Sequence, residues 1–346
     1  MILIYSIFSL LFIIIFLKYF ALKFKLVDIP NHRKMHKGVV PVIGGIAIYI
    51  NFLIYVYLFS TDKQLLTITF ITGIIVFIGL LDDRGDLPVI PRLTFQLIIT
   101  LLMIGSGIYV ADIGEYLFFS KIELGFFSIL ISVFAIMGLT NAINFIDGVD
   151  GLCSGIVILA LITMLFFCKS NNTFDLIKDI NLYYLLILSI IIFFILNFFT
   201  NKFKIFLGDN GSIFLGFILS SFLIYFTQPN NNFFHPCLVF WCVPLPILDL
   251  LSVTIRRMLR RKNPFKPDRR HIHHLLLDLK FKSRLVVFLL LLFSSFVSFI
   301  GYGVYNLYGS LWSLVMFVII LIYYIIFSII LSRYLTLKLI KIKIDD

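Results

Sequence analysis

The chain has 346 residues, of which 61% are hydrophobic and only 14% are charged, and its formal net charge is +11. A soluble domain averages about 25% charged residues, and no soluble fold of this size could bury so much apolar surface. The composition therefore excludes a soluble globular protein and predicts a chain that has the lipid bilayer as its solvent. The four cysteines lie in or beside apolar runs without a CxxC pair, which favours small buried side chains over a disulfide or zinc framework.

Eleven apolar runs approach the roughly 20 residues that a helix needs to cross the hydrocarbon core. In chain order they are 2–20, 42–59, 65–81, 93–110, 126–143, 153–168, 181–199, 212–227, 235–255, 285–306 and 311–334. The first run has neither a basic segment before it nor a small-residue cleavage site after it, so we interpret it as a membrane span and not as a signal peptide. The sequence predicts an all-α integral membrane protein with about eleven transmembrane helices.

Lysine and arginine indicate the orientation of these helices, because positive residues are retained on the cytoplasmic side. If the first helix runs from outside to inside, the inner segments hold 25 of the 29 basic residues. The outer segments hold only Lys63, Lys121, Lys169 and Lys178. The predicted topology therefore has the N-terminus outside and the C-terminus in the cytoplasm, in one polytopic domain over residues 1–346. Orientation and the binding of anionic headgroups explain most of these charges.

Six aspartates lie at or near the predicted cytoplasmic ends of the helices: Asp82, Asp83, Asp147, Asp150, Asp209 and Asp249. Each has a structural alternative. The tandem pair closes the third helix, although an anion there opposes the helix dipole. Asp209 could cap the eighth helix, for which Ser212 is the better N-cap. Asp249 lies within an apolar run, where a charge is costly and indicates function unless it pairs with Arg256 or Arg257.

The segment NAINFIDGVDGL (141–152) repeats a polar residue every three positions: Asn141, Asn144, Asp147 and Asp150. Three residues advance 300° around a helix, so such positions stay on one side. The glycines at 148 and 151 predict that the two aspartates lie on a turn where the helix ends. Neighbouring helices could satisfy Asn141 by packing alone. Two carboxylates on a glycine-rich turn exceed what packing requires, so we interpret this segment as functional.

Carboxylates that converge at a membrane interface suit Mg²⁺, which proteins hold with one or two carboxylates while substrate phosphates and water complete the octahedron. The sequence GDNGS (208–212) precedes a helix, whose first N–H groups favour a nearby phosphate. The basic segment 256–284 adds arginines and lysines that can clamp phosphate oxygens. Zinc at its three histidines is disfavoured, because no cysteine lies near them and the neighbouring residues are cationic. These features predict a membrane enzyme for a pyrophosphate-linked substrate.

Five motifs together resemble the family of polyprenyl-phosphate N-acetylhexosamine-1-phosphate transferases, in the family's order and spacing. They are LVDIPNHRKMHKGVVPVIGG (26–45), FIGLLDDRGDLPVIPRLTFQ (77–96), NAINFIDGVDGL (141–152), FLGDNGSIFLGF (206–217) and PFKPDRRHIHH (264–274). The form HIHH after PDR is similar to members that use UDP-GlcNAc, whereas members that use UDP-MurNAc-pentapeptide carry three consecutive histidines there. The resemblance implies transfer of GlcNAc-1-phosphate from UDP-GlcNAc to undecaprenyl phosphate, with release of UMP.

The resemblance also implies roles for single residues. The expected catalytic residues are Asp82, Asp83, Asp147 and Asp150. The expected metal ligands are Asp209, Asp82 and Asp83, with Mg²⁺ as the cofactor and Mn²⁺ as its alternative. The expected substrate-binding residues are Asn141, Asn144, Arg257, His271, His273 and His274. The inner segments expected to form the active site are 21–41, 82–92, 141–152, 200–211 and 256–284.

The expected partners are UDP-GlcNAc, undecaprenyl phosphate and membrane lipids, without nucleic acid; dimers are common in the family, which allows a homodimer. The expected location is the bacterial inner membrane, with the active site facing the cytoplasm. The alternatives are another UDP-N-acetylhexosamine as donor, or a polytopic transporter or flippase. Transporters tend to place carboxylates at the midplane between inverted repeats, which this chain lacks. We expect direct displacement by the lipid phosphate, with a covalent aspartyl-phosphate as the alternative.

Overall fold

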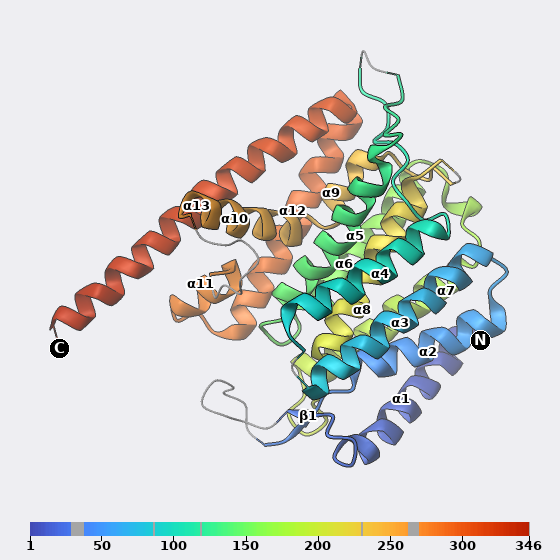
Figure 1. Cartoon of the computed structure of the whole chain (residues 1–346), viewed down its shortest axis with the longest axis horizontal. Coiled ribbons are helices and arrows are strands. Elements are labelled where there is room, and N and C mark those ends of the chain that lie inside the picture. Colours follow the sequence, from blue (N-terminus) through green and yellow to red (C-terminus); the bar gives the residue numbers. More distant parts are fainter. Residues whose placement is uncertain (29–37, 86, 118–119, 230, 262–269, 346) are drawn as a thin grey trace.

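The computed structural model describes residues 1–28, 38–85, 87–117, 120–229, 231–261 and 270–345. Helices make up most of this part of the chain (Figure 1). Within it, eight helices are long and apolar enough to cross a membrane. They are α1 (Ile2–Ala21), α3 (Lys63–Gly85), α5 (Phe127–Ile146), α6 (Leu152–Ser170), α7 (Ile180–Phe198), α8 (Gly208–Thr227), α12 (Ser283–Tyr308) and α13 (Ser310–Asp345).

Two shorter apolar helices and one bent pair complete the set. The shorter helices are α2 (Gly44–Phe59) and α4 (Val89–Gly105), and the bent pair is α9 (Val239–Cys242) with α10 (Pro244–Leu259). Together with the eight long helices, they follow the order of the eleven predicted runs. The prediction of an all-α membrane protein is therefore confirmed, while the number of crossings and the sidedness stay predictions.

The predicted span at 235–255 is wrong in one respect, because it is not a single helix. A 3₁₀ turn at Pro236–Leu238 leads into α9, and the axes of this segment and α10 differ by 85°. Pro244 occupies the first position of α10, where its missing N–H is not needed. Inside a continuous helix the same proline would lose a hydrogen bond and clash with the preceding turn. The bend brings α10 into contact with α13, α12 and α5.

Helix α8 is the centre of the bundle. Every residue from Asn210 to Thr227 is buried, and α8 packs most extensively against α3 and α5, and also against α2 and α6. Glycines permit this close approach: a Cβ on Gly45 of α2 would lie 2.2 Å from the Cα of Gly211, and one on Gly79 of α3 would lie 2.4 Å from the Cα of Asn210. The beginning of α8 is therefore fixed against the ends of its neighbours.

Short elements join the loops at this end of the bundle. Strand β1 (Val27–Asp28) pairs antiparallel with β2 (Val40–Pro41), and the Phe206 N–H donates to the Pro41 carbonyl at 2.8 Å. The helix α11 (Ile272–Asp278) lies toward the same side as β1 and the C-terminus in Figure 1. The connection between α4 and α5 stands at the opposite end of the molecule, and a 3₁₀ turn at Phe174–Leu176 joins α6 to α7.

Candidate active site

A hollow of about 1070 Å³ opens at the end of the molecule that carries β1 and β2. Its wall includes residues from all five segments expected to form the active site, represented by Val27, Asp83, Asp150, Asp209 and Ser283. Five of the six singled-out aspartates line it: Asp82, Asp83, Asp147, Asp150 and Asp209. The fold thus gathers segments that are far apart in the chain into one acidic hollow.

Asp83 caps the beginning of α8 from another helix. Its Oδ1 accepts the Asp209 N–H at 2.8 Å, and its Oδ2 accepts the Asn210 N–H at 3.3 Å and the Asn210 side-chain amide. The N-cap residue of α8 is Leu207, whose side chain offers no acceptor. A carboxylate is favoured at the positive end of a helix dipole, so Asp83 supplies the missing cap. The predicted N-cap Ser212 is wrong, since α8 begins earlier and holds both Asp209 and Ser212.

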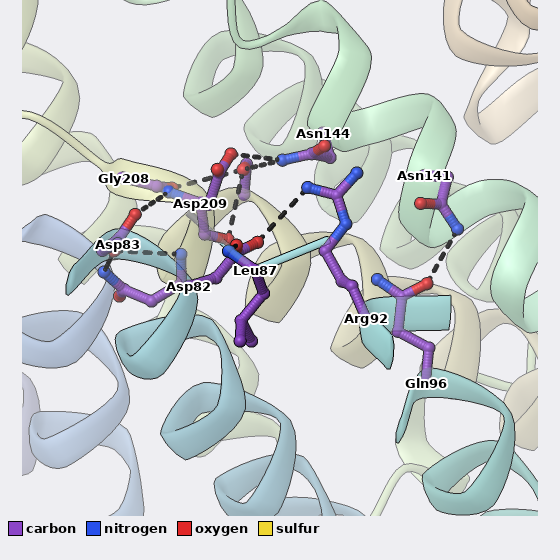
Figure 2. Close-up of polar contacts among 11 residues, drawn as sticks. Asp82, Asp83, Leu87, Arg92, Gln96, Asn141, Asn144, Gly208 and Asp209 are labelled. Carbon is purple, nitrogen blue, oxygen red and sulfur yellow. Dashed lines mark hydrogen bonds and ion pairs between the residues drawn. The ribbon is translucent and has the colours of Figure 1, made fainter. Parts of the chain in front are cut away.

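Asn144 of α5 orients Asp209 from the other side (Figure 2). Its Nδ2 lies 3.0 Å from Asp209 Oδ1 and 2.8 Å from the Ser212 hydroxyl. The other carboxylate oxygen of Asp209 accepts no hydrogen bond from the residues that the structure describes, and the side chain is exposed in the hollow. The result is a carboxylate with one oxygen held in place and one available to a ligand.

The turn after α5 forms as predicted. The helix ends at Ile146, and Gly151 adopts a φ of +81° before α6 begins. Asp150 lies in this turn, and its Oδ2 forms an ion pair of 2.6 Å with Lys204 Nζ. The Lys204 ammonium also lies 5.2 Å from the centre of the Phe206 ring. The turn therefore places a cation and an aromatic ring beside the carboxylates.

Asp147 is the least engaged of these carboxylates. It accepts no hydrogen bond within the described part of the chain, and its side chain keeps solvent exposure inside the hollow. The pKa of Asp147 is raised well above the usual range. The main cause is desolvation by the surrounding protein, and repulsion from the carboxylates of Asp209, Asp150 and Asp83 adds to it. A hard divalent cation placed among these oxygens would offset their repulsion.

The carboxylates of the hollow are the donors that could hold a metal ion. Within the described residues, no three His, Cys, Asp or Glu side chains converge as a ready-made metal site. This donor set fits Mg²⁺, which is commonly bound by one or two carboxylates and completed by substrate phosphates and water. It does not fit a permanent structural zinc site, which needs four protein ligands.

Asp82 and Arg92 form a separate contact at the edge of the hollow (Figure 2). Asp82 is buried; its Oδ1 accepts the Leu87 N–H at 2.8 Å, and its Oδ2 lies 3.3 Å from Arg92 Nη1. These contacts fix the connection between α3 and α4. They agree with the structural alternative for Asp82, while its catalytic and metal-binding roles stay predictions.

Asn141 points away from the aspartates. Its Nδ2 donates to the Gln96 side-chain oxygen at 2.9 Å and to the Met137 carbonyl at 2.7 Å, and Figure 2 shows this pair apart from the Asp209 cluster. Asn141 is therefore engaged in helix packing, and the expected contact with substrate has no geometric support.

The histidine motif lies against the acidic turn. His273 is completely buried, and a Cβ on Gly148 would lie 2.4 Å from its Nε2. Burial, together with the neighbouring His274, lowers the pKa of His273 to about 3, so its ring is neutral. His271 Nδ1 lies 2.8 Å from Asp249 Oδ2, so the partner of Asp249 is a residue of the histidine motif and not the arginine of the structural alternative. Arg257 is buried in the last turn of α10. The motif residues 29–37 and 262–269 lie outside the described residues.

Known proteins share this sequence pattern. Residues 64–227 match the model of the family described as glycosyl transferase family 4. A relative from Escherichia coli (strain K12), named undecaprenyl-phosphate alpha-N-acetylglucosaminyl 1-phosphate transferase, is 35% identical over 277 residues, which cover 76% of this chain and 72% of the relative. Relatives of the same name from Yersinia pestis and Salmonella typhi are 31% and 32% identical, over 76% and 81% of this chain and 73% and 77% of theirs.

The chain belongs to glycosyl transferase family 4. The resemblance seen in the motifs is thereby confirmed, and the chain is a multi-pass membrane transferase. The matched region runs from α3 to α8 and contains the aspartates from Asp82 to Asp209. The histidine motif lies beyond that region, and its His273 lies beside Gly148, which lines the hollow.

One residue of this family 4 site was not predicted from the sequence. The sequence places Lys204 only among the basic residues that orient the chain, because charges of that kind are common at cytoplasmic helix ends. Its pairing with Asp150 depends on two segments that are distant in sequence. Its place two residues before the FLGDNGS motif is the signal that would have singled it out.

Proposed function

We propose that this member of glycosyl transferase family 4 transfers GlcNAc-1-phosphate from UDP-GlcNAc to undecaprenyl phosphate and releases UMP. The names of its relatives support the transferred group and the lipid acceptor. The observation that carries the proposal is the hollow in which Asp83, Asp147 and Asp209 meet Lys204 at the ends of the membrane helices. The site is proposed to face the cytoplasm of a bacterium, at its inner membrane.

The proposed reaction joins two anions. An oxygen of the lipid phosphate attacks the β-phosphorus of UDP-GlcNAc, and the bond from that phosphorus to the bridging oxygen of UMP breaks. Phosphoryl transfer of this kind needs mainly positioning and charge stabilisation. Lys204 and Arg257 supply positive charge, and His271 and His274 are proposed to contact the diphosphate, while the buried His273 supports the turn at Gly148. Direct displacement is favoured, because a lipid monophosphate, with a second pKa of about 6, has already lost most of its protons at neutral pH.

Mg²⁺ is the cofactor that this donor set fits, with Mn²⁺ as its substitute. When bound, the ion would neutralise charge on the transferred phosphate and on the leaving UMP. Asp209 is the proposed principal ligand, because Asn144 orients one of its oxygens and leaves the other available. Asp147 is a second proposed ligand, since it has no competing hydrogen bond among the described residues. Asp83 acts mainly by holding the beginning of α8.

The experiment that tests this function is UMP release by the purified protein in detergent with undecaprenyl phosphate and Mg²⁺. UDP-GlcNAc, UDP-GalNAc and UDP-MurNAc-pentapeptide are compared as donors. We expect release with UDP-GlcNAc alone, which EDTA and Asp209→Asn both abolish. Asp175→Asn, an exposed carboxylate in the 3₁₀ turn between α6 and α7, is the matched control and should keep the wild-type rate. A folded protein that releases UMP from none of the donors would refute the proposal.

A further inference from the structure

Asp249 is a buried carboxylate that receives hydrogen bonds from two other helices. It lies within α10 and is 2% exposed. Its Oδ2 lies 2.8 Å from His271 Nδ1, and its Oδ1 accepts the Ile272 N–H at 3.0 Å and the Tyr324 hydroxyl at 3.1 Å. A charge in such surroundings is costly unless its oxygens are satisfied. The contacts therefore provide hydrogen bonds for both oxygens of this buried carboxylate.

The contact fixes which nitrogen of His271 carries a proton. An ionised carboxylate can only accept hydrogen bonds, so Nδ1 of His271 must donate. The other nitrogen, Nε2, is then left for a different partner. The ring lies 5.4 Å from the Phe145 ring, centre to centre, and 6.0 Å from the ring of His273. Asp249 thus holds His271 in one orientation beside the acidic turn.

Helix α13 supports this arrangement along one face. Tyr324, Ser328 and Ser332 recur every four residues, which places them on the same side of the helix. Ser328 accepts from Arg256 Nη1 at 2.7 Å, and Ser332 accepts from Arg270 Nη1 at 3.3 Å. Arg256 also donates to the Arg270 carbonyl at 2.7 Å. The last helix therefore holds both α10 and the residue that precedes His271.

We infer that Asp249 is a positioning residue of the transferase: it sets the tautomer and the orientation through which His271 contacts the substrate diphosphate, and Tyr324 secures it from α13. The inference rests on the proposed function, since it assigns Asp249 a role in that reaction. Asp249 touches no substrate in this scheme. It acts on the reaction only through the imidazole of His271.

Asp249→Asn tests the inference with almost no change in side-chain volume. The asparagine oxygen is held by the Ile272 N–H and the Tyr324 hydroxyl, so its amide N–H faces His271 Nδ1. His271 would then carry its proton on Nε2 instead. We expect kcat/KM for UMP release to fall on the order of 10- to 100-fold, by analogy with the partners that orient a metal-ligating histidine. Asp175→Asn should keep the wild-type value, and thermal unfolding in detergent checks that each variant is folded.

A double-mutant cycle separates positioning from structural support. In a His271→Ala background, Asp249→Asn should add little further loss, because the residue through which it acts is gone. An equal additional loss in that background would overturn the inference, as would full activity of the single variant. A wild-type protein without activity would refute the proposed function instead. In that case ¹⁵N NMR of the His271 ring still tests whether Asp249 sets the tautomer. A proton on Nε2 alone in the wild type would contradict the geometry.

Discussion

The N–H of Asp209 donates to the Oδ1 of Asp83 at 2.8 Å, although the two residues are 126 positions apart. One aspartate therefore caps the helix that presents the other to the hollow. A tandem acidic motif at the end of α3 and a GDNGS motif at the start of α8 act as one unit, so a substitution in either changes the position of the proposed metal ligand.

Asp83→Ala should destabilise the protein more than Asp209→Ala does. Loss of an N-cap acceptor costs about 0.5–2 kcal/mol, whereas the Asp209 carboxylate accepts only from Asn144 among the described residues. Both variants should lose most of their transferase activity. Thermal unfolding in detergent, beside the UMP assay, checks the difference. Equal unfolding temperatures for the two variants would contradict the capping role.

Asn144→Ala and Asn141→Ala should have different effects, although both asparagines lie on α5 in one motif. Asn144 orients Asp209, so its loss should lower kcat/KM on the order of tenfold or more and weaken the response to Mg²⁺. Asn141 contacts Gln96 in the packing of α4 on α5, so its loss should lower the unfolding temperature and largely spare the rate. Titration of UMP release against Mg²⁺ for each variant tells the two outcomes apart. A matching loss of rate in both would show that Asn141 belongs to the site.

Asp147 should make Mg²⁺ binding depend on pH. Its pKa is raised in the folded protein, so acidification through that pKa adds a proton that competes with the cation. A raised acidic pKa also means that the folded state binds more protons than the unfolded state, so ionisation of Asp147 lowers stability as pH rises. Asp147→Asn should therefore unfold at a higher temperature at pH 8 without Mg²⁺. A lower unfolding temperature there would show that the carboxylate is stabilising.

The features that depend on a short segment of the chain could be predicted from the sequence. The apolar runs are long enough to specify their helices, and the glycines after Ile146 specify the turn that carries Asp147 and Asp150. The distribution of basic residues predicted which loops lie together on one side of the membrane, and these loops contribute residues to the hollow. These features depend on length, composition and backbone freedom, all of which are written in short segments.

Contacts between distant segments could not be predicted in the same way. Asp83 was identified as functional, but its role as the cap of α8 depends on how α3 and α8 pack. Nor does the spacing of Asn141 and Asn144 show that one meets Gln96 and the other Asp209. For Asp249 the sequence offers an arginine close in the chain as the structural alternative to a functional role, whereas the structure pairs it with His271 at the beginning of a different helix. In each case tertiary packing selects among partners that are locally equivalent.

The complete burial of α8 has a consequence for how the protein is made. With a mean hydropathy of 1.5, α8 is the least apolar of the eight long helices, and its serines and glycines make it a poor partner for lipid tails. The helices it packs against, α2, α3, α5 and α6, all precede it in the chain. Since synthesis proceeds from the N-terminus, the helices that surround α8 are made first. They are therefore available to bury α8 when it leaves the ribosome.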